Sequence, residues 1–161
     1  MKQTEKKAGL PALPCACASL RRASRAVTQA YDRRLREVGL KTAQFTLLQV
    51  MQLAGEMTQG RLGKLLALDI TTLSRTLRPL ESEGWLECTT GGDRRERHWR
   101  ITSAGRKALE RSTPAWERAQ RELSARVGGK RLKAMMEELA VFADAPRSRA
   151  PVSSVRRAAR S

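Results

Sequence analysis

Apolar residues in the first third of the chain recur every three or four positions, the spacing that places side chains on one face of an α-helix. Between Ser19 and Val38 this stripe consists of Leu20, Ala23, Val27, Ala30, Tyr31, Leu35 and Val38. Gly39 follows and predicts the end of the helix. A second helix is predicted over Ala43 to Leu53, where the apolar residues are dense enough to require cover on most sides: Phe45, Leu47, Leu48, Val50 and Met51. We therefore expect the second helix to lie at the centre of the core.

The next segment, MTQGRLGKLLALDITTLSRTLRPLESEGWLEC, contains two short helical patterns separated by a break near Leu68 and Asp69. Two short helices joined by a tight turn are the layout of a helix-turn-helix. Thr58 and Asp69 stand where each helix should begin, and their side-chain oxygens can accept a hydrogen bond from the first turn. The charge of Asp69 also suits the positive end of a helix.

The second of these helices is predicted to be amphipathic. Its apolar positions are Ile70, Leu73, Leu77 and Leu80, which we expect to face the core. Polar and cationic residues lie roughly opposite, and such a face fits the major groove of DNA, where arginine meets guanine acceptors and hydroxyl groups meet phosphate. The residues predicted to contact DNA are Thr71, Thr72, Ser74, Arg75 and Arg78. The alternative is an ordinary solvated face. Pro79 fits only near the C-terminal end of the helix.

After Gly84 the pattern changes to the alternation of β-strands. Leu86 and Cys88 should point to one side, and later Trp99 and Ile101 should do the same. Two strands joined at Gly91 and Gly92 predict a β-hairpin. A hairpin directly after a recognition helix is a wing, and the residues assigned to it for DNA contact are Asp93, Arg94, Arg95 and Arg97. Arginine suits a narrow minor groove, and Asp93 is placed to hold Arg95 extended by a charge-assisted hydrogen bond.

Composition supports a helical nucleic-acid-binding protein. The 161 residues fit one domain of ordinary size, and the aromatic content of 4% favours a mainly α fold over a β-sandwich. The formal net charge of +16 points to a polyanionic partner. We expect no membrane partner, since there is no apolar run of about 18 residues. The interrupted apolar segment near the N-terminus does not fit a signal peptide, so a cytoplasmic location is expected.

The residues named above also carry a family resemblance. Leu65, the run Thr72 to Arg75, the run Leu80 to Leu86, the triplet Asp93 to Arg95 and the run Ile101 to Gly105 resemble the MarR family of bacterial winged-helix transcription regulators. The triplet DRR followed by a strand and IT-x-x-G is the most specific part, and the likeness covers about residues 17 to 143. It implies a homodimer on pseudo-palindromic operator DNA, usually a repressor, released when a small-molecule effector or an oxidant changes the spacing of its two DNA-binding lobes.

Two further helices are predicted after Thr102, which should cap the first of them. The first stripe contains Ala108, Leu109, Trp116, Ala119, Leu123 and Val127, and Pro114 within it is placed to bend the helix. The second, after Gly128 and Gly129, contains Leu132, Met135, Met136, Leu139, Val141 and Phe142. Helices that extend past the winged unit favour a twofold interface with a second copy. The alternative is that they fold back on their own domain.

The expected organisation follows from these elements. It comprises a flexible N-terminal segment (1–14), an N-terminal dimerisation helix (15–40), a winged helix-turn-helix DNA-binding lobe (41–102), C-terminal dimerisation helices (103–144) and a basic flexible tail (145–161). The tail would add nonspecific phosphate attraction.

The three cysteines suggest redox regulation. They are odd in number and are expected to be reduced at rest. The run Cys17 to Val27 is similar to the first helix of the peroxide-sensing branch of the family, whose reactive cysteine would fall at Cys17. Tyrosines hold the thiolate in that branch, whereas the matching positions here are Thr42 and Phe45. The alternative is that Cys15 and Cys17 are only small residues at the start of a dimer-facing helix, and Cys88 is expected to be an inward-facing strand residue.

Enzyme, metal and cofactor interpretations find little support. His98 is the only histidine, and the cysteines lack the CxxC spacing of a zinc site. No phosphate-binding glycine loop follows a predicted strand. We therefore expect no enzyme activity, no metal and no cofactor, with His98 a solvated strand residue beside the DNA and the tryptophans in the core. The remaining rival to an operator-specific regulator is a nonspecific architectural DNA-binding protein, which would also be basic and dimeric.

The wing assignment predicts the effect of one substitution. Arg95→Ala should weaken operator binding by on the order of a few kcal/mol at fixed salt, because the guanidinium that enters the minor groove is lost, while the dimer stays intact. Titration of a labelled operator, with the dimer measured by sedimentation, checks this. Unchanged affinity would contradict the prediction that the wing binds the minor groove, but it would not contradict the predicted fold.

Overall fold

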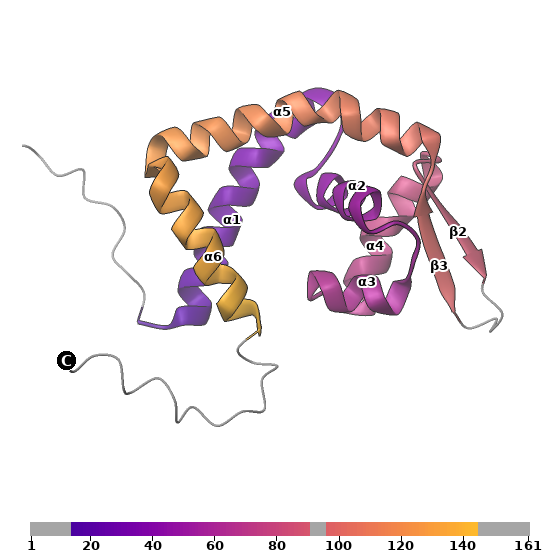
Figure 1. The fold of residues 1–161 in the computed structure, drawn as a ribbon, viewed down its shortest axis with the longest axis horizontal. Coiled ribbons are helices and arrows are strands. Elements are labelled where there is room, and N and C mark those ends of the chain that lie inside the picture. The colour runs from indigo at the N-terminus through magenta and orange to yellow at the C-terminus, as the bar shows by residue number, and fades with distance from the viewer. Residues whose placement is uncertain (1–13, 91–95, 145–161) are drawn as a thin grey trace, which may run out of the picture. The chain divides into compact units, whose positions relative to one another are not determined.

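The computed structural model describes residues 14–90 and 96–144 of the chain. In chain order the elements are α1 (Ala16–Leu35), the 3-10 turn η1 (Arg36–Val38), α2 (Thr42–Ala54), β1 (Met57–Thr58), α3 (Gln59–Leu66), α4 (Ile70–Ser82), β2 (Leu86–Thr90), β3 (Arg97–Ile101), α5 (Ser103–Val127) and α6 (Gly129–Asp144) (Figure 1). The predicted mainly α fold with a helix-turn-helix and a strand pair is confirmed. The chain divides into two compact units after Gln120, so the first unit ends inside α5.

The core of the first unit forms around α2, which packs against α1, α4 and β3. Its buried side chains are Phe45, Leu47, Leu48 and Met51, and those of α4 are Leu73, Leu77 and Leu80. Trp99 and Ile101 of β3 close this core from the sheet side. The expectation that α2 is the central helix is confirmed, although Leu53 near its end is 87% exposed.

The sheet has three antiparallel strands in the order β1, β3, β2. Leu86 pairs with Ile101 and Cys88 with Trp99, so the predicted alternation of the two long strands is correct. Met57 of β1 pairs with Trp99 from the other side. The sequence missed β1 because two residues are too short to show alternation.

Side-chain caps fix the helix starts. Thr58 accepts a hydrogen bond from the backbone N–H of Arg61 at 3.2 Å, and Asp69 accepts one from Thr72 at 2.8 Å. Thr102 accepts one from the backbone N–H of Gly105 at 3.0 Å. All three caps were predicted from the sequence. Gly39 ends the first helical segment in the left-handed conformation, with φ at 77°.

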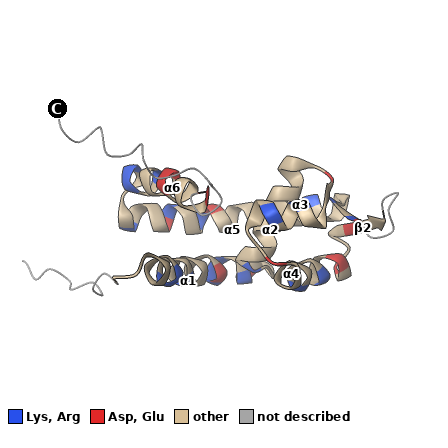
Figure 2. Ribbon diagram, turned by 90° about the horizontal axis from the view of Figure 1, so that it is seen from below, with Lys and Arg blue, Asp and Glu red and all other residues tan. Residues whose placement is uncertain are grey.

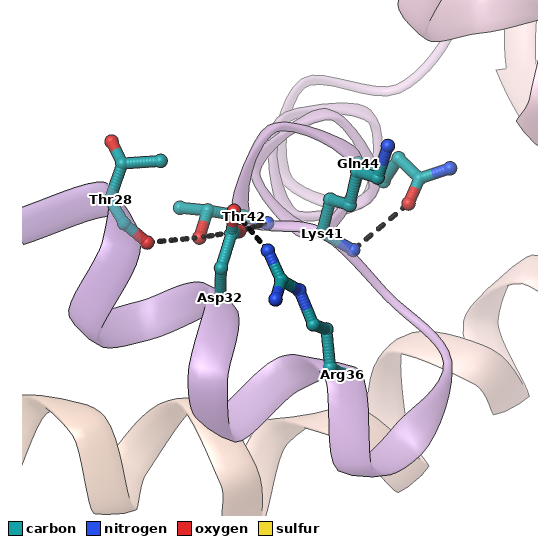
Figure 3. Close-up of polar contacts among 6 residues, drawn as sticks. All are labelled: Thr28, Asp32, Arg36, Lys41, Thr42 and Gln44. Atoms are coloured by element: carbon teal, nitrogen blue, oxygen red, sulfur yellow. Dashed lines mark hydrogen bonds and ion pairs between the residues drawn. The ribbon is translucent and has the colours of Figure 1, made fainter. Parts of the chain in front are cut away.

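A cap from another helix fixes the start of α2. The carboxylate of Asp32 on α1 accepts hydrogen bonds from the backbone N–H of Thr42 at 2.8 Å and from its hydroxyl at 2.7 Å (Figure 3). Arg36 lies 4.0 Å from the same carboxylate, and the backbone N–H of Lys41 donates to the side-chain oxygen of Gln44 at 2.9 Å. Because Asp32 and Thr42 belong to different helices, this cap ties α1 to α2.

The predicted apolar stripe of α5 is offset from the buried one. Within the first unit the buried residues of α5 are Gly105, Ala108, Ser112, Ala115 and Ala119. Trp116 is half-buried and stacks on Phe45, with ring centroids 5.8 Å apart. The small residues let α5 approach closely. Pro79 lies late in α4, as expected, and Pro114 lies inside α5.

The prediction that Ile70 faces the core is wrong. The spacing places Ile70 on the buried face of α4, but its side chain is 61% exposed. Ile70 is the first residue of the helix. Side chains in helices lean toward the N-terminus, so a residue in the first turn points past the contacts that bury Leu73 and Leu77.

The junction between β3 and α5 rests on the corner at Gly84 and Trp85. The hydroxyl of Thr102 donates to the carbonyl oxygen of Gly84 at 2.7 Å, and its backbone N–H donates to that of Trp85 at 3.0 Å. A Cβ atom added to Gly105 would overlap the carbonyl oxygen of Trp85 and lie 2.9 Å from Cγ1 of Ile101. In the run Ile101 to Gly105, the threonine therefore serves hydrogen bonding to this corner, and the glycine allows the close approach.

Gln59 joins three elements from a buried position. Its side-chain oxygen accepts a hydrogen bond from the indole N–H of Trp99 at 3.3 Å, and its amide nitrogen donates to the hydroxyl of Ser74 at 2.9 Å. Ser74 in turn donates to the carbonyl oxygen of Ile70 at 2.7 Å. The chain of hydrogen bonds sets how α4 sits against α3 and β3.

Gly105→Ala should destabilise the protein by about 3 kcal/mol, since the new methyl group meets a backbone oxygen that cannot swing away. Urea unfolding at a fixed protein concentration measures the effect. Gly60→Ala is the matched control, because a Cβ there meets nothing within 4 Å. Equal stability of the two variants would contradict the close approach at Gly105.

Gln59→Leu should cost about 1–3 kcal/mol of unfolding free energy, because the buried indole N–H of Trp99 loses its acceptor. Thermal or urea unfolding checks this, with Gln52→Leu on the exposed side of α2 as the control, expected within about 0.5 kcal/mol of the original protein. A Gln59→Leu variant as stable as the control would mean that the bridge contributes nothing.

Candidate nucleic-acid interface

The exposed side of α4 carries most of the residues that the sequence assigns to DNA contact. Thr71, Thr72, Arg75 and Arg78 are exposed, whereas Leu73, Leu77 and Leu80 on the other side are buried. Figure 2 shows basic and acidic residues along α4, and the acidic ones belong to its ends, at Asp69, Glu81 and Glu83. The middle of the exposed face is therefore cationic.

The two arginines of α4 have no competing partner nearby. The side chain of neither Arg75 nor Arg78 forms an ion pair or a hydrogen bond with another residue in the part of the chain that the structure describes. Guanidinium groups in this state keep all their donors for a ligand. Phosphate oxygens and the acceptors of guanine are groups that such donors pair with bidentately.

The hydroxyl of Thr72 is oriented by Asp69. It donates to the Asp69 carboxylate at 2.7 Å, in addition to the backbone hydrogen bond from Thr72. The backbone N–H of Thr72, and then its hydroxyl, lower the pKa of Asp69 below its usual value. With its only proton directed to Asp69, the Thr72 hydroxyl presents lone pairs to a ligand. It suits an amino group of adenine or cytosine better than a phosphate oxygen.

The hydroxyl groups of Ser74 and Thr71 differ in whether their proton is already used in a hydrogen bond within the protein. Ser74 is half-buried, and its hydroxyl both donates to Ile70 and accepts from Gln59, so its proton is already used within the protein. Thr71 is exposed, and its hydroxyl forms no hydrogen bond to another described residue. Of the three hydroxyl groups assigned to the interface, that of Thr71 is the one with a proton to offer.

The wing lies partly within the described residues. Arg97 at its base is exposed, and its guanidinium carbon lies 5.7 Å from the ring centroid of Trp99, a cation–π distance. Arg100 pairs with Glu87 on the neighbouring strand at 2.6 Å. Asp93, Arg94 and Arg95, which the sequence assigns to the tip, lie outside the described residues.

A hollow of about 430 Å³ separates the base of the wing from the helix-turn-helix. It is lined by Thr58, Gln59, Gly60, Ile70, Glu96 and Arg97. The starts of α3 and α4 therefore face the first residues of β3 across an open space. Nothing in the sequence pattern pointed to this hollow, because its walls come from three separate segments.

His98 is not the fully solvated residue that the sequence suggests. It is half-buried, and its ring nitrogens lie 3.4 Å from a carboxylate oxygen of Glu56 and 3.6 Å from one of Glu96. The two glutamates are distant in sequence, and β1 and β3 bring them together. No sequence motif indicates this pairing.

The cysteines are free thiols, with Cys15 and Cys17 exposed and Cys88 half-buried. Cys88 faces inward beside Trp99, as expected. The positions that match the thiolate-holding tyrosines have other roles here. The hydroxyl of Thr42 donates a hydrogen bond to Asp32, and the ring of Phe45 is buried against Trp116.

Neither a metal site nor a membrane-spanning helix is found in the described segments, residues 14–90 and 96–144. There, no cluster of three or more His, Cys, Asp and Glu side chains is placed to hold a metal ion. The helices there also lack the combination of length and apolar character needed to cross a membrane.

Comparison with known proteins places this geometry in a family. The MarR family model matches residues 40–96, which run from the end of η1 to the wing. The crystal structure of the Mycobacterium tuberculosis transcriptional regulator MosR, solved in complex with DNA, is 36% identical. It has a TM-score of 0.71, and the match covers 83% of this chain and 99% of that one.

Two further relatives agree with this assignment. YwoH of Bacillus subtilis, an uncharacterised HTH-type transcriptional regulator, is 28% identical over 91 residues, which are 56% of this chain and 66% of YwoH, just under two thirds. A mutant of MarR from E. coli, solved in complex with operator DNA, is 21% identical and shares the fold, with a TM-score of 0.69 over 78% of this chain and 91% of that one. The chain therefore belongs to the MarR family of winged helix-turn-helix transcriptional regulators.

Proposed function

We propose that this protein binds operator DNA as a homodimer and represses transcription from it. The observation that carries the proposal is the exposed side of α4, where Thr71, Arg75 and Arg78 lack partners among the described residues while the opposite side is buried. A helix held in this way can enter the major groove, since its core face does not have to move. The MosR structure in complex with DNA supports the same assignment.

Each residue has a chemical role in this proposal. Arg75 and Arg78 pair with guanine acceptors or phosphates, Thr71 donates to a phosphate, and Thr72 accepts from a base amino group. Ser74 acts mainly by holding α4 through Gln59. The wing residues Asp93, Arg94 and Arg95 address the minor groove, and Arg97 lies at the base of the wing.

The homodimer is supported by the apolar surface of α6. Leu132 is its only buried residue, while five large apolar side chains are exposed on this helix: Met135, Met136, Leu139, Val141 and Phe142. Exposed apolar surface of that size on one short helix is typical of a protein interface. A second copy of the chain is the expected partner, because most soluble oligomers are homo-oligomers and twofold dimers are the commonest of them.

Release by a small-molecule effector belongs to the same proposal. A hollow of about 260 Å³ between η1, Trp85 and α5 is lined by Val38, Trp85, Ala108, Arg111 and Ser112. Its lining combines apolar side chains with the guanidinium of Arg111 and the hydroxyl of Ser112, which suits a small aromatic or aliphatic acid. Release through oxidation of Cys17, the alternative from the sequence, is less favoured because Thr42 and Phe45 are committed to other contacts.

Arg75→Ala should weaken binding to the preferred duplex by about 1–3 kcal/mol, because a base or phosphate loses a bidentate partner. Fluorescence anisotropy at fixed salt, with the duplex obtained by selection from random sequences, measures the effect. Lys107→Ala is the charge-matched control. Lys107 is exposed near the start of α5, which follows the end of β3 that is farther from the wing turn. Equal effects from both variants would contradict a specific role for α4.

The same measurement separates the regulator from a nonspecific architectural protein. A regulator prefers the selected duplex over random DNA, and Arg75→Ala reduces that preference. An architectural protein binds both with similar affinity and a similar salt slope. Failure of the selection to enrich any sequence would overturn the proposed function.

A further inference from the structure

Ile70 is a large apolar residue that the core does not use. Its side chain is 61% exposed, although the residues that follow it on the same stripe, Leu73 and Leu77, are fully buried. It borders the open hollow between α4 and the base of the wing. Its immediate surroundings on α4 are polar and cationic, with Thr71 and Arg75 also exposed.

The position of Ile70 is fixed from two sides. Asp69, directly before it, caps the first turn of α4 by two hydrogen bonds from Thr72. The carbonyl oxygen of Ile70 accepts a hydrogen bond from Ser74, whose hydroxyl is held by buried Gln59. The exposed side chain therefore projects from a backbone that is anchored to the core, which suits a residue that must meet a ligand in one register.

Within the proposed function, Ile70 lies at the end of α4 that meets base edges, since the N-terminal residues of a recognition helix make those contacts. The major-groove edges of the bases carry one apolar group, the C5-methyl of thymine. Arg75 and Arg78 on the exposed side of α4 attract the polyanion whose bases carry such a methyl group. A water-exposed isoleucine gains free energy there only by covering that group.

We propose that Ile70 is a specificity-determining residue that packs against a thymine methyl group in the operator. The inference rests on the proposed function, because it requires α4 to lie in the major groove. It adds a base preference that the polar residues of α4 do not provide. The ligand is a thymine in each half-site, opposite the first turn of α4.

The test uses the full-length protein and the duplex enriched from random sequences. Each thymine in that duplex is replaced in turn by deoxyuridine, which lacks the methyl group and keeps the Watson–Crick edge. At one thymine per half-site, the replacement should weaken binding of the original protein about fourfold, the factor that corresponds to one buried methyl group. In Ile70→Ala, thymine and deoxyuridine at that position should bind equally well.

Two controls make the assignment specific. Leu53→Ala removes an aliphatic side chain that is also exposed, at 87%, but lies on α2, so it should keep the fourfold difference. Thr71→Ser removes a second exposed methyl group of the first turn, keeps the hydroxyl and should also keep the difference. Thermal unfolding should be unchanged in Ile70→Ala, because the residue contributes little to the core.

The outcomes separate the inference from the function. If selection enriches a sequence but Ile70→Ala keeps the full sensitivity to deoxyuridine at every thymine, the inference is overturned and operator binding stands. If Thr71→Ser alone abolishes the sensitivity, the methyl contact belongs to Thr71 and the assignment to Ile70 is wrong. If selection enriches no sequence, the proposed function itself fails.

Discussion

Burial of one side of α4 is the constraint on which the remaining structure depends. Leu73, Leu77 and Leu80 are fully buried, and α4 packs against both α2 and β2. Burying these leucines removes apolar surface from water, which stabilises one rotation of the helix about its axis. Beyond the first residue of α4, that rotation decides which side chains remain outside. Thr71, Arg75 and Arg78 are exposed because they lie on the side of α4 opposite the buried leucines.

Hydrogen bonds then refine what the exposed side can recognise. Asp69 accepts a hydrogen bond from the hydroxyl of Thr72, and the carbonyl oxygen of Ile70 accepts one from that of Ser74. These two hydroxyl groups therefore meet a ligand differently from that of Thr71. Buried Gln59 connects Ser74 to Trp99 and so links the recognition helix to the base of the wing. The proposed interface is therefore ordered by contacts within the protein, which lowers the cost of binding DNA.

A second set of contacts joins the N-terminal helix to the lobe within the first unit. Asp32 caps α2, the hydroxyl of Tyr31 donates to Gln120 on α5, and Arg118 lies 3.3 Å from Glu37. Burial raises the pKa of Tyr31, so its hydroxyl remains a donor at neutral pH. These links connect α1 to α2, the helix against which α4 packs.

The sequence by itself determined the helices, their caps and the cationic face of α4. Those features follow from periodicity and from local hydrogen bonds, which involve residues close together in the chain. Only the tertiary structure decided that Ile70 is exposed, that Gln59 bridges Ser74 and Trp99, and that Glu56 meets His98. These contacts join segments distant in sequence, or depend on where a helix begins against its neighbours. The periodicity of apolar residues describes one segment at a time, so it cannot predict contacts between segments that are distant in the chain.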